Sequence, residues 1–168
     1  ASELIEINHN NTYRKTIEKT KKVSVYYQDK MNAMEAYRET LFNAIKKRLV
    51  GQEKVGVLLS GGVDSSLVAS IAKEIVPEVI GFTAGIEGSP DIINAKIAAK
   101  SLGIPLKIRF LNRDTILEIL PKVVEAIEDR DLLQVEAALP MFAALEVAKS
   151  GGIRVLPSDY HHLQGLML

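Results

Sequence analysis

The chain has 168 residues, carries 21 Lys and Arg residues against 21 Asp and Glu residues, and contains no cysteine. This length suits one α/β core, and the balanced charge gives no overall field that would attract nucleic acid or an anionic membrane surface. The absence of cysteine excludes disulfides and thiol chemistry and, with no signal peptide and no membrane span of roughly 20 apolar residues, predicts a cytoplasmic protein.

The first 30 residues differ in composition from the rest of the chain. They are rich in Asn, Thr, Lys and Glu, with little periodicity before an apolar run at residues 23–27. We interpret residues 1–30 as an N-terminal arm or linker, partly a strand, and residues 31–168 as one domain. That domain is expected to open with a helix, whose apolar face carries Met34, Tyr37, Leu41, Ile45 and Leu49.

Residues 57–66 form the most informative segment, Val-Leu-Leu-Ser-Gly-Gly-Val-Asp-Ser-Ser. The apolar run at residues 55–59 is typical of a strand buried on both faces, and apolar residues recur at helical spacing from residue 64 onward. Between them, Gly61 and Gly62 permit a sharp turn and let a ligand approach the backbone. The turn is therefore expected at a helix N-terminus, where unpaired N–H groups and the helix dipole attract an anion.

The side chains of this turn sharpen the prediction. Ser60, Ser65 and Ser66 add hydroxyl donors, which favours a bound oxyanion such as phosphate. Asp64 would repel phosphate unless a cation lay between them, and Mg²⁺ is the natural choice. The segment has neither the lysine of a Walker A loop nor the glycine spacing of a dinucleotide fingerprint. The alternative is an ordinary strand-to-helix turn in which Ser and Asp cap the helix.

Strands and helices are predicted to alternate after the turn. A buried strand is expected over residues 79–84. The next helix is expected to begin with Ser89 as its cap and to run to about Leu102, because proline and an acidic residue follow the serine and a glycine follows the leucine. A further strand is predicted over residues 106–110, with partial alternation that indicates a more exposed position.

Two prolines shape the prediction for the next helices. Asp114 is expected to cap a short helix that breaks at Pro121, and a second helix is expected to run to about Glu128. A later helix is expected to open at or just before Pro140 and to end at residues 150–152.

A fourth strand is predicted over residues 153–156. The alternation of strands and helices predicts an α/β fold, a doubly wound parallel sheet with helices on both faces. Ligands bind such sheets beyond the carboxyl ends of the strands, at the switch point of the topology. The turn at residues 60–66 is expected there.

The Ser-Gly-Gly-Val-Asp-Ser-Ser segment resembles the pyrophosphate-binding loop of the N-type ATP pyrophosphatases, the PP-loop superfamily. Residues 82–91 and 98–105 are similar to the synthetase domain of asparagine synthetases, as are the blocks at residues 120–125 and 138–142. The likeness covers about residues 31–156 and is greatest to short archaeal relatives without a glutaminase domain. It implies a fold of the adenine nucleotide alpha hydrolase type.

The resemblance also implies ATP and Mg²⁺ as cofactors. Residues 60–66 would hold the β and γ phosphates, Asp64 would bind Mg²⁺ as the catalytic group, and the adenine would be lined by Leu58, Ala84 and Gly85. A substrate carboxylate, with aspartate as the default, would attack the α phosphorus and release pyrophosphate. An amine or ammonia would then displace AMP, which implies an AMP-forming carbon–nitrogen ligase of amino-acid biosynthesis.

The C-terminal end departs from the family pattern. The second family signature, Ser-Gly-x-Gly-[Ala/Ser]-Asp-Glu, is expected after the fourth strand, but only Ser158 and Asp159 could stand in for it. Asp159 is a weak candidate for a second Mg²⁺ ligand. We therefore expect the domain to be truncated, divergent or catalytically impaired.

Other functions stay open on the sequence. One is a nucleotide-binding module that has lost its chemistry, and another is a PP-loop enzyme such as a GMP synthetase, an NAD synthetase or a tRNA-modifying relative. Because the chain has no cysteine to release ammonia from glutamine, a separate subunit could supply it. No nucleic acid or membrane partner is expected, and the charge-balanced surface is compatible with a homodimer.

Overall fold

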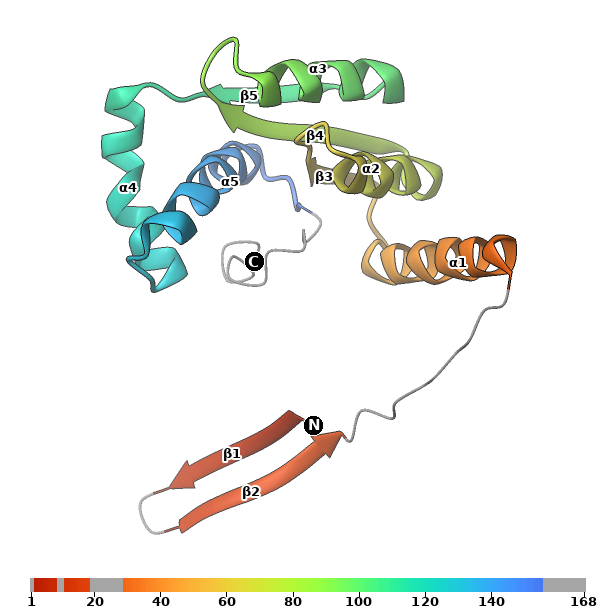
Figure 1. Ribbon diagram of the computed structural model, residues 1–168, viewed down its shortest axis with the longest axis vertical. Helices are drawn as coiled ribbons and strands as arrows, with labels where there is room; N and C mark the ends of the chain where they lie inside the picture. Colours follow the sequence, from red (N-terminus) through yellow and green to blue (C-terminus); the bar gives the residue numbers. More distant parts are fainter. Residues whose placement is uncertain (1, 9–10, 19–28, 156–168) are drawn as a thin grey trace. The chain divides into compact units, whose positions relative to one another are not determined.

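A computed structural model describes residues 2–8, 11–18 and 29–155 of the chain (Figure 1). The chain forms two compact units, residues 1–38 and residues 39–168, and each is considered by itself. The boundary between the units falls within helix α1, which spans Lys30–Arg48. The predicted strand within residues 23–27 lies outside the described residues.

The first unit contains a β-hairpin that the sequence did not predict. Strands β1 (Ser2–Asn8) and β2 (Asn11–Glu18) pair antiparallel, and Asn8 pairs with Asn11. The register shifts between Ser2 and Glu3. Residues 2–8 and 11–18 therefore hold more regular structure than their weak periodicity indicated.

The second unit is built on a parallel sheet with strand order β3-β4-β5. Its elements in chain order are β3 (Lys54–Leu58), α2 (Val63–Ile75), β4 (Glu78–Gly85), α3 (Pro90–Leu102), β5 (Leu106–Phe110), α4 (Arg113–Ile127) and α5 (Leu132–Ser150). The strands and the helices α2 and α3 form where the hydrophobic pattern predicted them. Among the described residues, no helix has the length and apolar character needed to cross a membrane.

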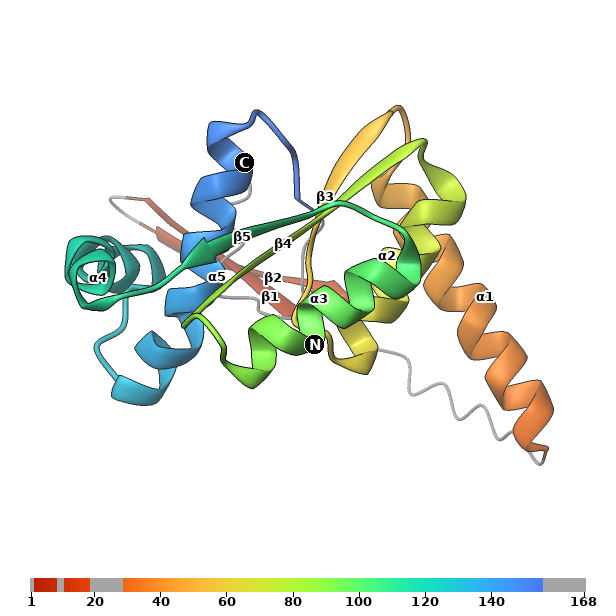
Figure 2. The same ribbon diagram turned by 90° about the horizontal axis from the view of Figure 1, so that it is seen from above.

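Helices flank the sheet on both faces (Figure 2), and a hydrophobic cluster lies between the strands and the helices on each face. On one face, Val55, Val57 and Leu59 pack with apolar residues of α2, α3 and the C-terminal half of α1. On the other face, Ile80 and Phe82 pack with α5 and with the apolar side of α4. Successive residues of a strand point to opposite faces, so a strand buried on both sides must be apolar throughout. The predicted doubly wound α/β fold is confirmed.

Helix α4 runs unbroken through Pro121, so the predicted break was wrong. Its cap is Asn112, whose side chain accepts from the Thr115 N–H at 2.9 Å, and not Asp114, which lies in the first turn. A proline inside a helix costs about 3 kcal/mol. The complete burial of Ile119 and Val123 against the α5 side of the core offsets that cost.

Helix α5 begins at Leu132, well before Pro140, so the predicted start was also wrong. Asp131 caps it by accepting hydrogen bonds from the N–H groups of Leu133 at 3.0 Å and Gln134 at 3.3 Å. Buried Val135 then begins the apolar face that continues past the proline. The Asp131 cap and the buried face of α5 together stabilise the helix enough to keep Pro140 in its interior, although proline prefers the first turn of a helix.

The predicted fourth strand is a single parallel bridge within the described residues. Val155 pairs with Gly56 of β3, and the Gly56 N–H donates to the Arg154 carbonyl at 2.8 Å. Leu156, the predicted end of this strand, lies outside the described part of the chain. The bridge places residue 155 on the edge of β3 opposite to β4, so the topology switches direction at β3.

Two helix caps allow a matched test of what a cap contributes. Ser89 occupies the N-cap position of α3, as predicted, but its side chain makes no capping bond, and its buried hydroxyl has no hydrogen-bond partner among the described residues. We expect Ser89→Ala to change the free energy of unfolding by less than about 0.5 kcal/mol, because no bond is lost. Asp131→Ala should lower it by about 1 kcal/mol, as loss of a bonded cap does.

Urea unfolding followed by circular dichroism measures both variants. A loss from Ser89→Ala as large as that from Asp131→Ala would show that the serine does cap α3 in solution.

Candidate functional site

The turn between β3 and α2 lies at the carboxyl edge of the sheet, at the switch point. The Leu59 N–H donates to the Phe82 carbonyl at 2.8 Å, which holds the chain beside β4 for one residue beyond β3. The chain then leaves the sheet through Ser60, Gly61 and Gly62, and α2 begins at Val63. In doubly wound sheets this is where ligands bind.

Gly61 brings the turn into direct contact with the backbone of α3. Its φ is +81°, and a Cβ at this position would lie 2.4 Å from the carbonyl carbon of Asn94 and 2.7 Å from the nitrogen of Ala95. No side chain fits in that space. Ala95 is fully buried at this contact, so a small residue on α3 and a glycine in the turn meet.

Four hydrogen bonds close the turn on itself. The Ser65 hydroxyl lies 3.1 Å from the Ser60 hydroxyl, accepts from the Ser60 N–H at 3.3 Å and donates to the Gly62 carbonyl at 3.2 Å. The Ser60 hydroxyl also accepts from the Gly62 N–H at 3.3 Å. The end of β3 is thereby joined to the first turn of α2 without any ligand.

The first turn of α2 remains open to an anion. Gly62 is the N-cap and supplies no side-chain bond, and the first helical hydrogen bond runs from the Ser66 N–H to the Gly62 carbonyl at 3.1 Å. The N–H groups of Val63, Asp64 and Ser65 have no partner among the described residues. Such unpaired donors, with the positive end of the helix dipole, form an anion-binding position.

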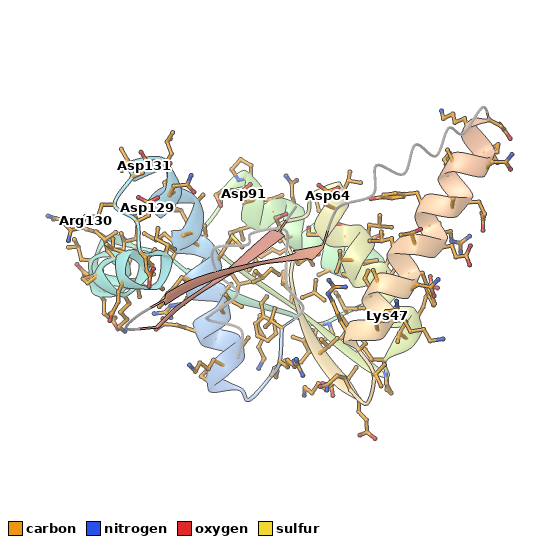
Figure 3. All side chains as sticks on the ribbon, turned by 90° about the horizontal axis from the view of Figure 1, so that it is seen from below. Lys47, Asp64, Asp91, Asp129, Arg130 and Asp131 are labelled. Atoms are coloured by element: carbon orange, nitrogen blue, oxygen red, sulfur yellow. The ribbon has the colours of Figure 1, made fainter. Side chains whose placement is uncertain are left out.

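Asp64 lies in this first turn and is exposed (Figure 3). Its carboxylate makes no ion pair or hydrogen bond with another described residue, so it is available to a cation. Among the described residues no group of three or more potential metal ligands gathers around Asp64 or elsewhere. Mg²⁺ accepts such a site, since it uses one or two carboxylates together with substrate phosphates and water. Asp159, the second predicted Mg²⁺ ligand, lies outside the described residues.

The predicted adenine residues lie at the carboxyl ends of β3 and β4. Ala84 is buried, and half-buried Leu58 packs against the same hydrophobic cluster. Gly85 lies at the end of β4, where a Cβ would be 3.2 Å from the Ile92 side chain. Leu58 and Ala84 therefore face the α5 side of the sheet, whereas Gly85 borders α3 on the opposite side.

The backbone of Ala84 has polar groups that no strand pairs. The carbonyl of Phe82 faces β3, where it accepts from Leu59, and the carbonyl of Gly85 faces β5, where it accepts from Leu111 at 2.9 Å. Since N–H and C=O groups alternate between the two edges along a strand, those of Ala84 face the β3 side. Strand β3 ends at Leu58, opposite Phe82, so the Ala84 groups point beyond it.

Sequence reasoning missed part of this arrangement. The α3 backbone at Asn94 and Ala95 supports the turn, and the only signal for it in the sequence is a row of alanines at positions 95, 98 and 99. A second feature is the ion pair of Arg109 on β5 with Glu146 on α5, which Lys122 joins at 3.6 Å. It ties the edge strand to the two helices that cover this face.

A parallel sheet wound on both faces, with a Ser-Gly-Gly turn at its switch point, defines an α/β domain of the doubly wound class. Residues 36–159 match the family described as asparagine synthase. The chain belongs to the asparagine synthase family.

Two relatives show the extent of the match. A putative glutamine-hydrolysing asparagine synthetase of Methanocaldococcus jannaschii is 36% identical over 145 residues, which cover 84% of this chain and 27% of that protein. A glutamine-hydrolysing asparagine synthetase of Arabidopsis thaliana is 37% identical over 134 residues, covering 73% of this chain and 23% of that protein. The chain thus spans about a quarter of the length of these relatives.

Two solved structures share the fold. The NH₃-dependent NAD synthetase of Campylobacter jejuni gives a TM-score of 0.51 at 22% identity, covering 72% of this chain and 54% of that chain. A glutamine-dependent NAD⁺ synthetase of Acinetobacter baumannii, solved with ADP, gives 0.52 at 17% identity, covering 78% and 26%. This likeness shows the fold alone, and it agrees with the predicted α/β fold.

The two glycines of the turn provide a matched pair of substitutions. We expect Gly61→Ala to lower the free energy of unfolding by about 1–3 kcal/mol, because its φ is positive and its Cβ would overlap the α3 backbone. Gly62→Ala should lower it by less than about 1 kcal/mol, since its φ is −72° and the nearest atom, the Ser60 hydroxyl oxygen, is 3.4 Å from the new Cβ.

Thermal or urea unfolding compares the two variants. Equal losses would contradict the contact between Gly61 and α3.

Proposed function

We propose that the domain binds ATP and adenylates a substrate carboxylate before amide formation, with aspartate as the first substrate to test. The observation that carries the proposal is the open first turn of α2 at the switch point of a chain of the asparagine synthase family. Membership of that family supports a ligase, and the turn supplies the anion-binding position that such chemistry needs. The ligase activity named for the relatives belongs to proteins about four times as long as the matched part of this chain, so we propose it here.

The turn at residues 60–66 would hold the β and γ phosphates of ATP. The unpaired N–H groups of Val63, Asp64 and Ser65 point out of the first turn, and phosphate oxygens are acceptors that such donors satisfy. Gly62 leaves space beside them because it has no side chain. The contact of Gly61 with α3 supports this assignment, because it holds the turn beside that helix.

The adenine would lie against the ends of β3 and β4. Ala84 offers one N–H and one C=O beyond the end of β3, which match the paired donor and acceptor of an adenine edge. Leu58 would provide apolar contact beside these groups, with Gly85 following Ala84 at the end of β4. Recognition through the backbone agrees with the absence of any charged residue among the three.

Asp64 would hold Mg²⁺, and its exposed, unpaired carboxylate fits that ion. When bound, the ion offsets the negative charge of the phosphates during pyrophosphate release. The protein's own contribution is to orient the triphosphate, so that a carboxylate oxygen can approach the α phosphorus in line with the departing pyrophosphate. Ammonia or another amine would then displace AMP from the acyl-adenylate.

The partners of the proposed reaction are small molecules. Ammonia would come from solution or from a separate subunit, and the cytoplasm is the compartment we propose. A homodimer is compatible with the charge-balanced composition.

The function is tested by following ATP-to-AMP conversion and pyrophosphate release with aspartate and ammonia. Conversion that depends on both compounds would support the ligase. Tight ATP binding without pyrophosphate release, over aspartate and other carboxylates, would favour a nucleotide-binding module. Conversion with a different carboxylate would keep the reaction class and replace the substrate.

Asp64 and Asp91 form a matched pair for the proposed Mg²⁺ role. Both carboxylates are exposed and lie in the first turns of neighbouring helices, α2 and α3 (Figure 3). We expect Asp64→Asn to weaken Mg²⁺-dependent ATP binding by about tenfold or more, the effect of losing one charged contact of about 1.5–3 kcal/mol. Asp91→Asn removes the same charge from an equivalent helix position and should leave the affinity within about twofold.

Isothermal titration calorimetry with and without Mg²⁺ measures the ATP affinity of both variants. The same loss in both variants would trace the effect to general electrostatics and refute a ligand role for Asp64.

A further inference from the structure

We infer that Arg109 and Glu146 are positioning residues for the adenine base. Arg109 lies on β5 and Glu146 on α5, and their ion pair holds α5 in register with the strands that it covers. Neither side chain would contact the nucleotide. The inference rests on the proposed function, because it concerns the space in which the base of ATP would lie.

Arg109 is the strand neighbour of the proposed adenine residue Ala84. In the parallel pairing of β4 with β5, Ala84 is the partner of Arg109, and Phe82 is the partner of Lys107. Neighbouring strands are about 5 Å apart, and paired residues point to the same face of the sheet. Ala84 and Phe82 belong to the hydrophobic cluster on the α5 face, so the side chain of Arg109 emerges on that face beside Ala84.

The ion pair joins three elements of this face. The Arg109 guanidinium donates to the Glu146 carboxylate, and the ammonium of Lys122 on α4 lies 3.6 Å from the same carboxylate. The side chains of Arg109 and Glu146 are only 23% and 30% exposed. Water and salt screen such a half-buried pair less than they screen a surface pair. The pair therefore connects the edge strand firmly with the helices that cover it.

This connection supplies a constraint that the apolar core lacks. Burial of apolar surface is non-directional, so the hydrophobic cluster keeps α5 on the sheet but restricts its sliding along the strands less sharply. A contact between a planar guanidinium and a carboxylate has a defined geometry. It therefore sets the register of α5 against β5, and with it the part of α5 that lies beside Ala84.

The register of α5 matters for the base and not for the phosphates. Helices α3 and α5 lie on opposite faces of the sheet (Figure 1). The turn proposed for the phosphates is held by the contact of Gly61 with α3. The base would lie against Leu58 and Ala84, which face α5. A displaced α5 would therefore change the space for the base and leave the phosphate position intact.

Two ligands, one with the base and one without it, separate these effects. Titration calorimetry measures the affinities for ATP and for inorganic pyrophosphate, each with Mg²⁺, in Arg109→Met, Glu146→Gln and the double variant. Circular dichroism checks that each variant is folded at the assay temperature. The matched controls are Lys54→Met and Glu78→Gln. They break a 2.7 Å ion pair between the first residues of β3 and β4, whose side chains are 46% and 50% exposed.

We expect Arg109→Met and Glu146→Gln each to weaken ATP binding by about tenfold, comparable to one net hydrogen bond to the base, and to leave pyrophosphate binding within about twofold. The double variant should lose no more than either single variant, because both act through one contact. The control variants should change neither affinity. Arg109→Met removes a positive charge and Glu146→Gln removes a negative one, so a loss shared by both cannot come from long-range electrostatics.

Unchanged ATP affinity in Glu146→Gln would overturn the inference, and so would equal losses for ATP and pyrophosphate. If Arg109→Met did not fold, Glu146→Gln would carry the test, because it keeps the size of the side chain. An unmodified protein that bound pyrophosphate but not ATP would refute the proposed function and this inference with it. If the unmodified protein and the variants bound ATP equally well, the proposed function would stand and the inference alone would fail.

Discussion

The contact between Gly61 and the backbone of α3 is the constraint on which the site depends. Gly61 has a positive φ and no room for a side chain. It therefore lets the chain turn from the end of β3, in contact with the backbone of α3, into the first turn of α2. That path leaves the first turn of α2 with unpaired N–H groups at the edge of the sheet. The serine contacts then hold the turn closed, so the helix start is both open to an anion and fixed in place.

The position of this turn follows from the way the sheet is wound. Helices α2 and α3 lie on one face, while α5 covers the other face and leads back to residue 155 on the far side of β3. Because the chain connections on the two sides of β3 run over opposite faces of the sheet, neither connection covers the carboxyl end of β3. Gly56 allows the close approach there, since a Cβ would be 2.9 Å from the Phe82 ring and 3.0 Å from Val155.

Much of this fold could be predicted, and the errors have physical causes. The strands were predicted because burial on both faces requires unbroken apolar runs, and α2 and α3 because their glycine, serine and proline signals agree with their periodicity. Both errors in helix bounds concern Pro121 and Pro140, whose local cost is outweighed by packing between α4, α5 and the sheet. The hairpin β1–β2 was missed because its sequence shows little alternation of apolar and polar residues, although asparagines mark its turn.

The sequence by itself predicted the class of site, because glycines, serines and an aspartate between a strand and a helix suit little except an oxyanion and its cation. It also determined the family, through the blocks that follow the turn. Only the tertiary structure decided which groups remain available there. Composition treats the three serine hydroxyls as equal, but those of Ser60 and Ser65 are hydrogen-bonded within the turn, while that of Ser66 has no partner among the described residues. Likewise, the unpaired backbone of Ala84 follows from where β3 ends beside β4, which no local pattern specifies.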